Sequence, residues 1–361
     1  RGLGDVYKRQ VEYYIYRVIF LGLWKVISKR YIEELSGGKM KRKILVTIPL
    51  EEEHKRKIEN IASDAEVIYI TPDKAERSIV QEAEIILGNV PVDAVRGSKN
   101  LKWMQLNSAG ANQYTEEGVL LEGTILTNAT GAYGLAIAEH MLGMVLNLQK
   151  KLHLYAENQK NHMWKDEGPV TSIYGSKTLV VGLGDIGGEF AMRMHALGSK
   201  VYGVRRNKSE IPDYLQNIYQ LDMLDDILHE FDIVALSLPE TKETKNLFDG
   251  QKFGKMKKGA ILLNVGRGST VHTADLCDAL NSGILGGAGL DVVDTEPLPA
   301  ESPLWDAKNL VLTPHVSGGY HLKETLERIR KISIENLESY YNKAPMKNLV
   351  DFKTGYRKFV K

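Results

Sequence analysis

The sequence predicts an α/β protein with two domains, each built on a doubly wound parallel sheet. Three observations support this fold class. The chain has 361 residues, enough for about two domains. From Lys43 onward, short apolar runs alternate with helical stretches, which is typical of parallel sheets with crossover helices. Hydrophobic residues make up 43% and charged residues 26% of the chain, which indicates an ordinary soluble, folded protein.

Residues 1–39 differ from the rest of the chain. Their longest uncharged run, residues 18–24, is far shorter than the roughly 18–20 apolar residues that span a bilayer. Residues 1–10 resemble a translated sequencing adapter, and residues 37–40 can be encoded by a ribosome-binding sequence followed by a start codon. We therefore expect a non-native leader at 1–39, which an intact-mass measurement of the natural protein would test. A native amphipathic extension is the alternative, because aromatic residues there share one helical face.

The first half of the chain predicts five strands, most of them followed by a turn residue. A charged segment, residues 51–60, follows the first of them. Residues 135–148 are apolar almost throughout and predict a helix buried on most sides, suited to a place between two domains. The expected strands are 44–48, 67–70, 85–87, 103–106 and 125–127.

The second half predicts six strands, the count of a doubly wound dinucleotide-binding fold. They are 178–181, 201–204, 233–236, 260–263, 289–292 and 310–312. Residues 322–341 then form one long amphipathic pattern. We expect this helix to pack back on the first domain.

Charge and cysteine content exclude several classes of function. The 47 basic residues nearly cancel the 46 acidic ones, so no global field attracts nucleic acid or an anionic membrane surface. The single cysteine, Cys277, cannot form an internal disulfide, and no Cys/His cluster has metal-ligand spacing. We therefore predict no metal site and a reducing, cytoplasmic compartment.

A glycine motif, Gly182-Leu183-Gly184-Asp185-Ile186-Gly187, directly follows a predicted strand and opens a helical stretch. The first glycine permits a tight turn, the second lets the backbone approach a pyrophosphate, and the third allows the helix to pack closely on the strand. The helix N-terminus would face the phosphates with free N–H groups. The backbone of Gly182, Gly184, Asp185, Ile186 and Gly187 is therefore predicted to bind a dinucleotide.

The end of the next strand bears on which dinucleotide is bound. NAD favours an acidic residue there, because a carboxylate accepts hydrogen bonds from the ribose hydroxyls. This chain has Arg205 and Arg206 instead, and two guanidinium groups suit a 2′-phosphate. We predict NADP as the preferred cofactor, with NAD also accepted. A solvated basic turn with no specific role is the alternative.

Three further segments follow consecutive predicted strands and carry Arg267, Glu296 and His315. In an open α/β sheet the carboxyl ends of the strands form the ligand edge, so we expect these side chains to converge. Reduction of a 2-oxo acid requires a cation for the carboxylate, a proton donor and an acid that orients the donor. The other eight histidines serve as a comparison. None of them, including His140 in the apolar helix, follows a strand with a matched acid and arginine.

These motifs together resemble the D-isomer-specific 2-hydroxyacid dehydrogenase family, from Met40 to about Phe352. The resemblance implies that Arg267, Glu296 and His315 are catalytic. It also implies a Rossmann cofactor domain, residues 141–316, inserted in a flavodoxin-like substrate domain, residues 41–140 plus 317–361, and a homodimer. The segments that carry the resemblance are 180–187, 236–244, 264–268, 289–292 with Glu296-Pro297, and Thr313-Pro314-His315.

The same resemblance assigns further residues to the two ligands. It implies that Asp291 meets the nicotinamide carboxamide, and that Pro239, Thr244 and Val265 lie along the cofactor. It places a substrate carboxylate near the backbone amides of Ser108, Ala109 and Gly110, with Asn89 close by. From the residues alone, a Ser-Ala-Gly turn after a strand fits an anion-binding nest and an ordinary tight turn equally well.

We therefore predict an oxidoreductase that reduces a small 2-oxo acid to the D-2-hydroxy acid with NADPH, or runs the reverse reaction. A formate dehydrogenase is one alternative, but its relatives carry Gln where Glu296 stands. A non-catalytic NAD(P)-sensing protein is another, but such a protein tolerates loss of the triad and usually adds disordered tails. Two departures from the family pattern are Ser237, where many relatives have His, and Arg205, where Asp is common.

Overall fold

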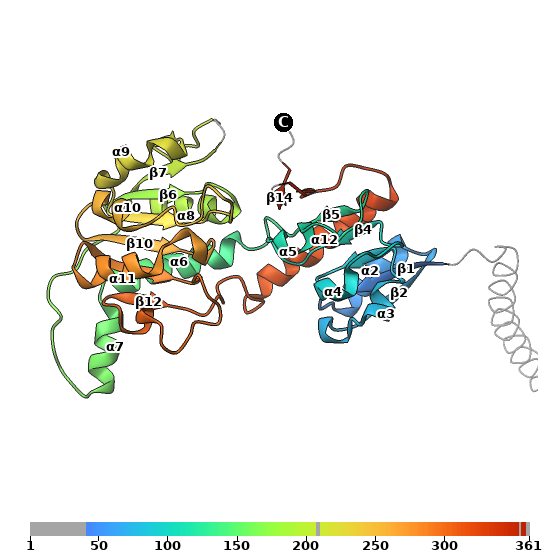
Figure 1. Ribbon diagram of the computed structural model, residues 1–361, viewed down its shortest axis with the longest axis horizontal. Helices are drawn as coiled ribbons and strands as arrows, with labels where there is room; N and C mark the ends of the chain where they lie inside the picture. The colour runs from blue at the N-terminus through green and yellow to red at the C-terminus, as the bar shows by residue number, and fades with distance from the viewer. Residues whose placement is uncertain (1–40, 207–209, 354, 359–361) are drawn as a thin grey trace, which may run out of the picture.

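A computed structural model describes residues 41–206, 210–353 and 355–358 (Figure 1). The leader predicted at residues 1–39 lies outside the described residues. The chain forms two lobes side by side, each with its own parallel sheet (Figure 1). The predicted fold class is thereby confirmed.

The first sheet has five parallel strands in the order β2-β1-β3-β4-β5. This order is flavodoxin-like, with the switch point between β1 and β3. The central strands contain the apolar runs that the sequence predicts: β3 and β4 are buried throughout, and β1 is buried from Ile44 to Val46. The strands are β1 (Arg42–Val46), β2 (Ala65–Tyr69), β3 (Ile85–Leu87), β4 (Trp103–Gln105) and β5 (Ile125–Thr127).

The second sheet has seven parallel strands in the order β12-β11-β10-β9-β6-β7-β8, the Rossmann order with one strand added at the β12 edge. The prediction of six strands was wrong by one. The missed strand, β8, has only three half-buried residues and pairs with β7 alone, so it leaves no apolar run in the sequence. The strands are β6 (Lys177–Val181), β7 (Lys200–Val204), β8 (Asn217–Tyr219), β9 (Ile233–Leu236), β10 (Ala260–Asn264), β11 (Leu285–Leu290) and β12 (Leu310–Leu312).

Helices flank both sheets, and a short antiparallel hairpin, β13 (Val350–Asp351) with β14 (Tyr356–Arg357), lies near the C-terminal end. The longer helices are α2 (Glu52–Ile61), α6 (Gly134–Gln149), α7 (Leu152–Lys160), α8 (Asp185–Ala196), α11 (Thr273–Asn281) and α12 (Lys323–Tyr341). The shorter ones are α3 (Arg77–Val80), α4 (Val92–Val95), α5 (Asn112–Thr115), α9 (Leu224–Ile227) and α10 (Gly250–Lys255).

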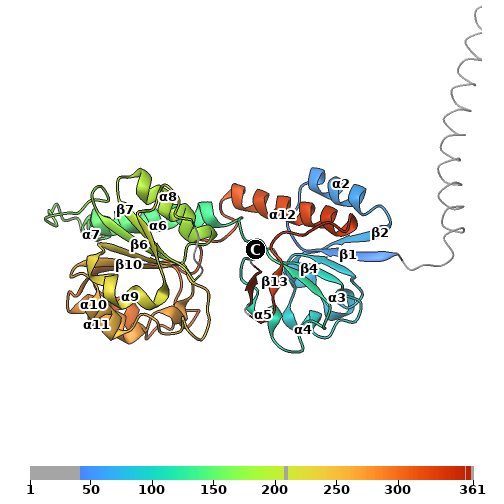
Figure 2. The same ribbon diagram turned by 90° about the horizontal axis from the view of Figure 1, so that it is seen from above.

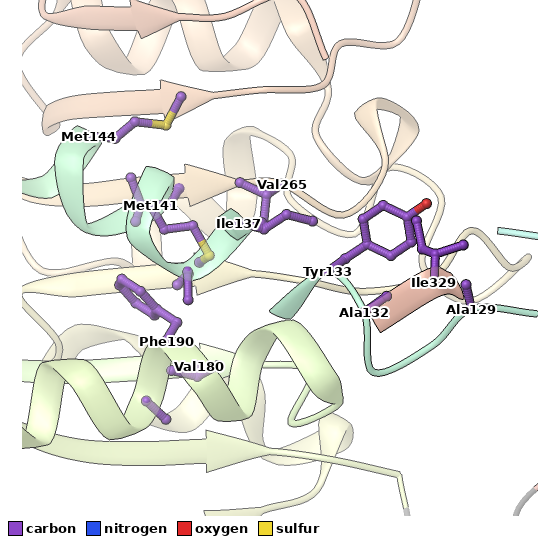
Figure 3. Packing of buried hydrophobic residues seen from close by; sticks show 14 of the residues in the cluster. Ala129, Ala132, Tyr133, Ile137, Met141, Met144, Val180, Phe190, Val265 and Ile329 are labelled. Carbon is purple, nitrogen blue, oxygen red and sulfur yellow. The ribbon is translucent and has the colours of Figure 1, made fainter. Parts of the chain in front are cut away.

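Helix α6 packs on the second sheet, and its buried face explains the apolar run in its sequence. Ile137, Met141 and Met144 point towards residues of β6, α8 and the end of β10 (Figure 3). A Cβ added at Gly289 of β11 would lie 2.9 Å from the sulfur of Met144, so glycine lets this helix approach the sheet closely. The helix begins at Gly134 and therefore runs across the predicted domain boundary at 140/141.

The C-terminal helix α12 returns to the first lobe, as expected, where it lies beside α2 (Figure 2). Tyr340 stacks on Trp103 of β4 with ring centroids 5.2 Å apart. Asn336, which is fully buried, donates a hydrogen bond of 2.7 Å from Nδ2 to Gln105 Oε1. These contacts hold the C-terminal half of α12 against β4.

Cys277 gives a first test of the packing around α11. Its side chain is only 5% exposed, and burial raises the pKa of its thiol, with a smaller contribution from Asp278. Because the thiolate is the reactive form, we expect Ellman's reagent at pH 8 to react with the native protein at least about tenfold more slowly than with the guanidinium-unfolded chain. Equal rates in the two states would contradict this packing.

Within the residues that the structure describes, no helix has both the length and the apolar character needed to cross a membrane.

Candidate active site

The loops after β9, β10, β11 and β12 meet at one edge of the second sheet, because these strands are neighbours and parallel. The three predicted catalytic residues, Arg267, Glu296 and His315, line a single pocket at this edge. The sequence places them far apart, so their convergence is a property of the fold. Three of the other lining residues, Glu240, Gly268 and Val292, lie in segments that carry the family resemblance. The remaining ones are Lys245, Ser269, Val293 and Asp294.

His315 and Glu296 are in direct contact, with 2.8 Å between Nδ1 and Oε2. A carboxylate only accepts hydrogen bonds, so Nδ1 carries the proton and Nε2 is the nitrogen left for a ligand. The other carboxylate oxygen of Glu296 accepts the backbone N–H of Val293 at 3.1 Å. The acid therefore has a fixed orientation, and it in turn orients the imidazole.

Arg267 follows β10 in a turn held by Asn264. The Asn264 side chain accepts from the N–H of Gly266 at 3.1 Å and donates to the carbonyl of Arg267 at 2.9 Å. A Cβ at Gly268 would overlap the backbone of Val293, so only glycine lets this turn lie against the loop of Glu296. The guanidinium itself reaches the first lobe, since a Cβ added at Gly110 would lie 2.5 Å from Nη2 of Arg267.

The loop of Ser108, Ala109 and Gly110 therefore lies directly beside Arg267. The Ser108 hydroxyl donates to the carbonyl of Gly110 at 2.7 Å and accepts from Nδ2 of Asn89 at 3.1 Å. Among the described residues, no acceptor is found for the backbone N–H groups of Ser108, Ala109 and Gly110. Three N–H groups beside a guanidinium form a suitable site for an anionic group.

The glycine motif forms the turn between β6 and α8, with its glycines in distinct environments. Gly182 has φ +104°, and a Cβ there would lie 2.7 Å from the carbonyl oxygen of Ser237. A Cβ at Gly187 would overlap the carbonyl of Gly182. At Gly184 the same Cβ would meet nothing within 4 Å. The second glycine therefore faces open space at a helix N-terminus, where a pyrophosphate fits.

Asp185 has a different contact from the other members of this motif. Its Oδ2 accepts the backbone N–H groups of Gly131 at 3.0 Å and Gly134 at 3.1 Å. The carboxylate therefore caps the first turn of α6, and a bound pyrophosphate would meet the backbone of Asp185 instead of its side chain.

Arg205 and Arg206 come directly after β7, as predicted, and Arg206 is exposed. A hydrogen bond from Thr241, assisted by the charge of Arg206, lowers the pKa of Glu243. The positive charge of Arg206 therefore acts on the 239–244 loop. Thr244 is buried and donates to the carbonyl of Pro239 at 2.7 Å, which fixes the shape of that loop.

The sequence is similar to those of several known proteins. The family model described as "D-isomer specific 2-hydroxyacid dehydrogenase, NAD binding domain" matches residues 142–317. A glyoxylate/hydroxypyruvate reductase B of Escherichia coli is 34% identical over 286 residues, which cover 75% of this chain and 86% of that protein. A hydroxypyruvate reductase of Blautia hydrogenotrophica is 30% identical over 282 residues, covering 74% and 85%.

A solved structure of a similar protein has the same overall fold. The crystal structure of a D-isomer specific 2-hydroxyacid dehydrogenase family protein from Aeromonas salmonicida superposes with a TM-score of 0.76 at 30% identity, covering 87% of this chain and 100% of that one. The sequence, the family model and the fold therefore agree, and the chain belongs to the D-isomer specific 2-hydroxyacid dehydrogenase family.

Proposed function

We propose that this protein interconverts a small 2-oxo acid and the corresponding D-2-hydroxy acid, with NADPH preferred over NADH. The observation that carries the proposal is the pocket in which the His315–Glu296 pair and Arg267 lie together, with Arg267 beside the Ser108–Gly110 loop. A cation, an oriented imidazole and an anion-binding loop are the groups that this reaction needs.

Each of the three side chains has a defined part in the proposed reaction. Arg267 and the N–H groups of the Ser108–Gly110 loop hold the substrate carboxylate, and Arg267 also polarises the C2 carbonyl. When the imidazole of His315 is protonated on both nitrogens, Nε2 gives its proton to the oxygen that develops negative charge; in the reverse direction the neutral ring takes the proton back on Nε2. Glu296 stabilises the protonated imidazole and keeps Nε2 aimed at the substrate.

The residues around the glycine motif fit a dinucleotide. The backbone from Gly184 to Gly187 would hold the pyrophosphate, and Val265, Pro239 and Thr244 would line the remainder of the site. When bound, the nicotinamide supplies the hydride to C2 of the oxo acid or accepts it from the hydroxy acid. We assign this site to a cofactor domain at 141–316, and the substrate loop to a domain at 41–140 plus 317–361.

Two glycine variants separate cofactor binding from folding. Gly184→Ala should leave the melting temperature within about 2 °C and weaken NADPH binding at least about tenfold, because its Cβ enters only the ligand's space. Gly187→Ala should lower the melting temperature by several degrees, because its Cβ overlaps the turn itself. Thermal unfolding and fluorescence titration with NADPH measure both effects. Equal behaviour of the two variants would contradict the proposed pyrophosphate site.

The proposed activity is tested by a panel of 2-oxo acids assayed with NADPH and with NADH. We expect turnover of at least one small 2-oxo acid and formation of the D enantiomer of the product, identified by chiral chromatography. Formate oxidation serves as the comparison reaction. The absence of turnover with every 2-oxo acid, while NADPH still binds, would exclude the dehydrogenase and favour a nicotinamide-sensing protein. A homodimer is expected from the family resemblance, and the solution mass tests it.

A further inference from the structure

We infer that His140 is a positioning residue for His315, acting through Thr313 and Asp291; the inference rests on the proposed role of His315. His140 lies on α6, far from the catalytic loops in sequence. Its Nε2 is 3.0 Å from the hydroxyl oxygen of Thr313 and 3.9 Å from Oδ1 of Asp291. Among the described residues, no other histidine apart from His315 itself has a hydrogen bond or ion pair with Thr313 or Asp291.

The hydrogen bonds that link His140, Thr313 and Asp291 have one consistent direction. A threonine hydroxyl has a single proton, and the short 2.6 Å contact from Thr313 Oγ1 to Asp291 Oδ1 uses it, because a carboxylate only accepts. The Thr313 oxygen must then accept from His140. Nε2 of His140 therefore carries a proton, and the hydrogen bonds run from His140 to Thr313 to Asp291.

Asp291 in turn holds the loop of His315. Its carboxylate is 1% exposed and accepts the backbone N–H groups of Val316 at 3.0 Å and Ser317 at 3.1 Å, together with the Ser317 hydroxyl. Its main-chain carbonyl accepts the N–H of His315 at 2.8 Å. Three successive amides of the loop are thus bound by one residue.

This support matters because His315 adopts a backbone conformation that its side chain disfavours. Its φ is +51°, in the left-handed region where residues other than glycine are uncommon. A loop in such a conformation persists only when surrounding contacts determine it. Asp291 provides those contacts, and the Thr313 hydroxyl and His140 fix the orientation of Asp291. Loss of the His140 donor should therefore move the imidazole of His315.

The test compares His140→Leu, which removes the donor, with His140→Gln, whose amide nitrogen can replace Nε2–H. We expect His140→Leu to lower kcat about tenfold, equivalent to about 1.4 kcal/mol, and His140→Gln to stay within threefold of wild type. The KM for NADPH should change less than twofold in both. The matched control is His153→Leu. It removes a histidine of α7 that is hydrogen-bonded to Asn309, and it should leave kcat unchanged.

Two results would overturn the inference. One is a kcat of His140→Leu within twofold of wild type. The other is equal losses in the Leu and Gln variants, which would assign the effect to packing. If His140→Leu does not fold, Thr313→Val and Thr313→Ser make the same comparison, since Val removes the hydroxyl and Ser keeps it. In that pair, equal kcat values would overturn the inference.

A measurement on the substrate-free protein separates this inference from the proposed function. In ¹⁵N-histidine-labelled protein, long-range proton–nitrogen spectra report the tautomer of each imidazole. We expect the Nε2–H tautomer for His140 at pH 7.5, and a changed His315 signal in His140→Leu but not in His153→Leu. The Nδ1–H tautomer at His140 would overturn the chain of hydrogen bonds, whatever the enzyme assay shows. Absence of 2-oxo acid turnover with the expected spectra would instead count against the proposed function.

Discussion

Replacing His315 with alanine should lower kcat for 2-oxo acid reduction by about 10²–10⁴-fold, the usual contribution of a positioned general acid. The imidazole lies in the pocket with Arg267, bonded to Glu296 at 2.8 Å, and its Nε2 is left to meet the substrate. It contributes a proton and not cofactor affinity. The Kd for NADPH, measured by fluorescence titration, should therefore stay within about twofold of wild type.

The comparison variant is His229→Ala, which removes a histidine remote from the pocket-lining residues and should leave kcat unchanged. The kcat of Glu296→Gln should fall between those of His315→Ala and His229→Ala. An amide oxygen can still accept from Nδ1, but it no longer balances the charge of a protonated imidazole. A near wild-type kcat for His315→Ala would remove His315 from the mechanism. A loss that appears only in the Kd for NADPH would reassign it to the cofactor site.

The fold could be predicted from the sequence wherever a strand is apolar and fully buried. Such strands, for example residues 85–87 and 233–236, begin and end where the sequence places them. The seventh strand of the cofactor sheet, Asn217–Tyr219, could not be predicted, because it is a short edge strand whose side chains remain half exposed. Its formation depends on pairing with β7 and not on a pattern of its own.

The candidate site likewise contains some features that the sequence could predict and others that it could not. Arg267, Glu296 and His315 were predictable because each follows a strand, and parallel strands bring their carboxyl ends to one edge. His140 was not, because its partner Thr313 lies 173 positions away and only the packing of α6 on the sheet brings them together. The side-chain contact of Asp185 with the start of α6 was also missed, since a motif specifies backbone roles and not where an intervening side chain turns.

Cofactor preference depends on the two arginines after β7. We expect kcat/KM to be about ten- to a hundredfold higher with NADPH than with NADH, or about 1.4–2.8 kcal/mol. A 2′-phosphate carries roughly −1.5 to −2 charges, and hydrogen bonds from a guanidinium to such a group contribute about 1.5–3 kcal/mol each. Desolvation and ordering of the exposed Arg206 offset part of this gain, as does the nearby carboxylate of Glu243.

Arg205→Asp should reverse the preference, because a carboxylate at the end of β7 repels the 2′-phosphate and accepts hydrogen bonds from the free ribose hydroxyls of NADH. The change should appear mainly in KM for the two cofactors, since this contact is remote from the hydride and stabilises ground and transition states alike. Lys200→Asp reverses a charge at the exposed opposite end of the same strand and should leave the ratio unchanged. If the wild-type enzyme uses NADH as efficiently as NADPH, or more efficiently, the arginines form only a solvated basic turn and the predicted preference is wrong.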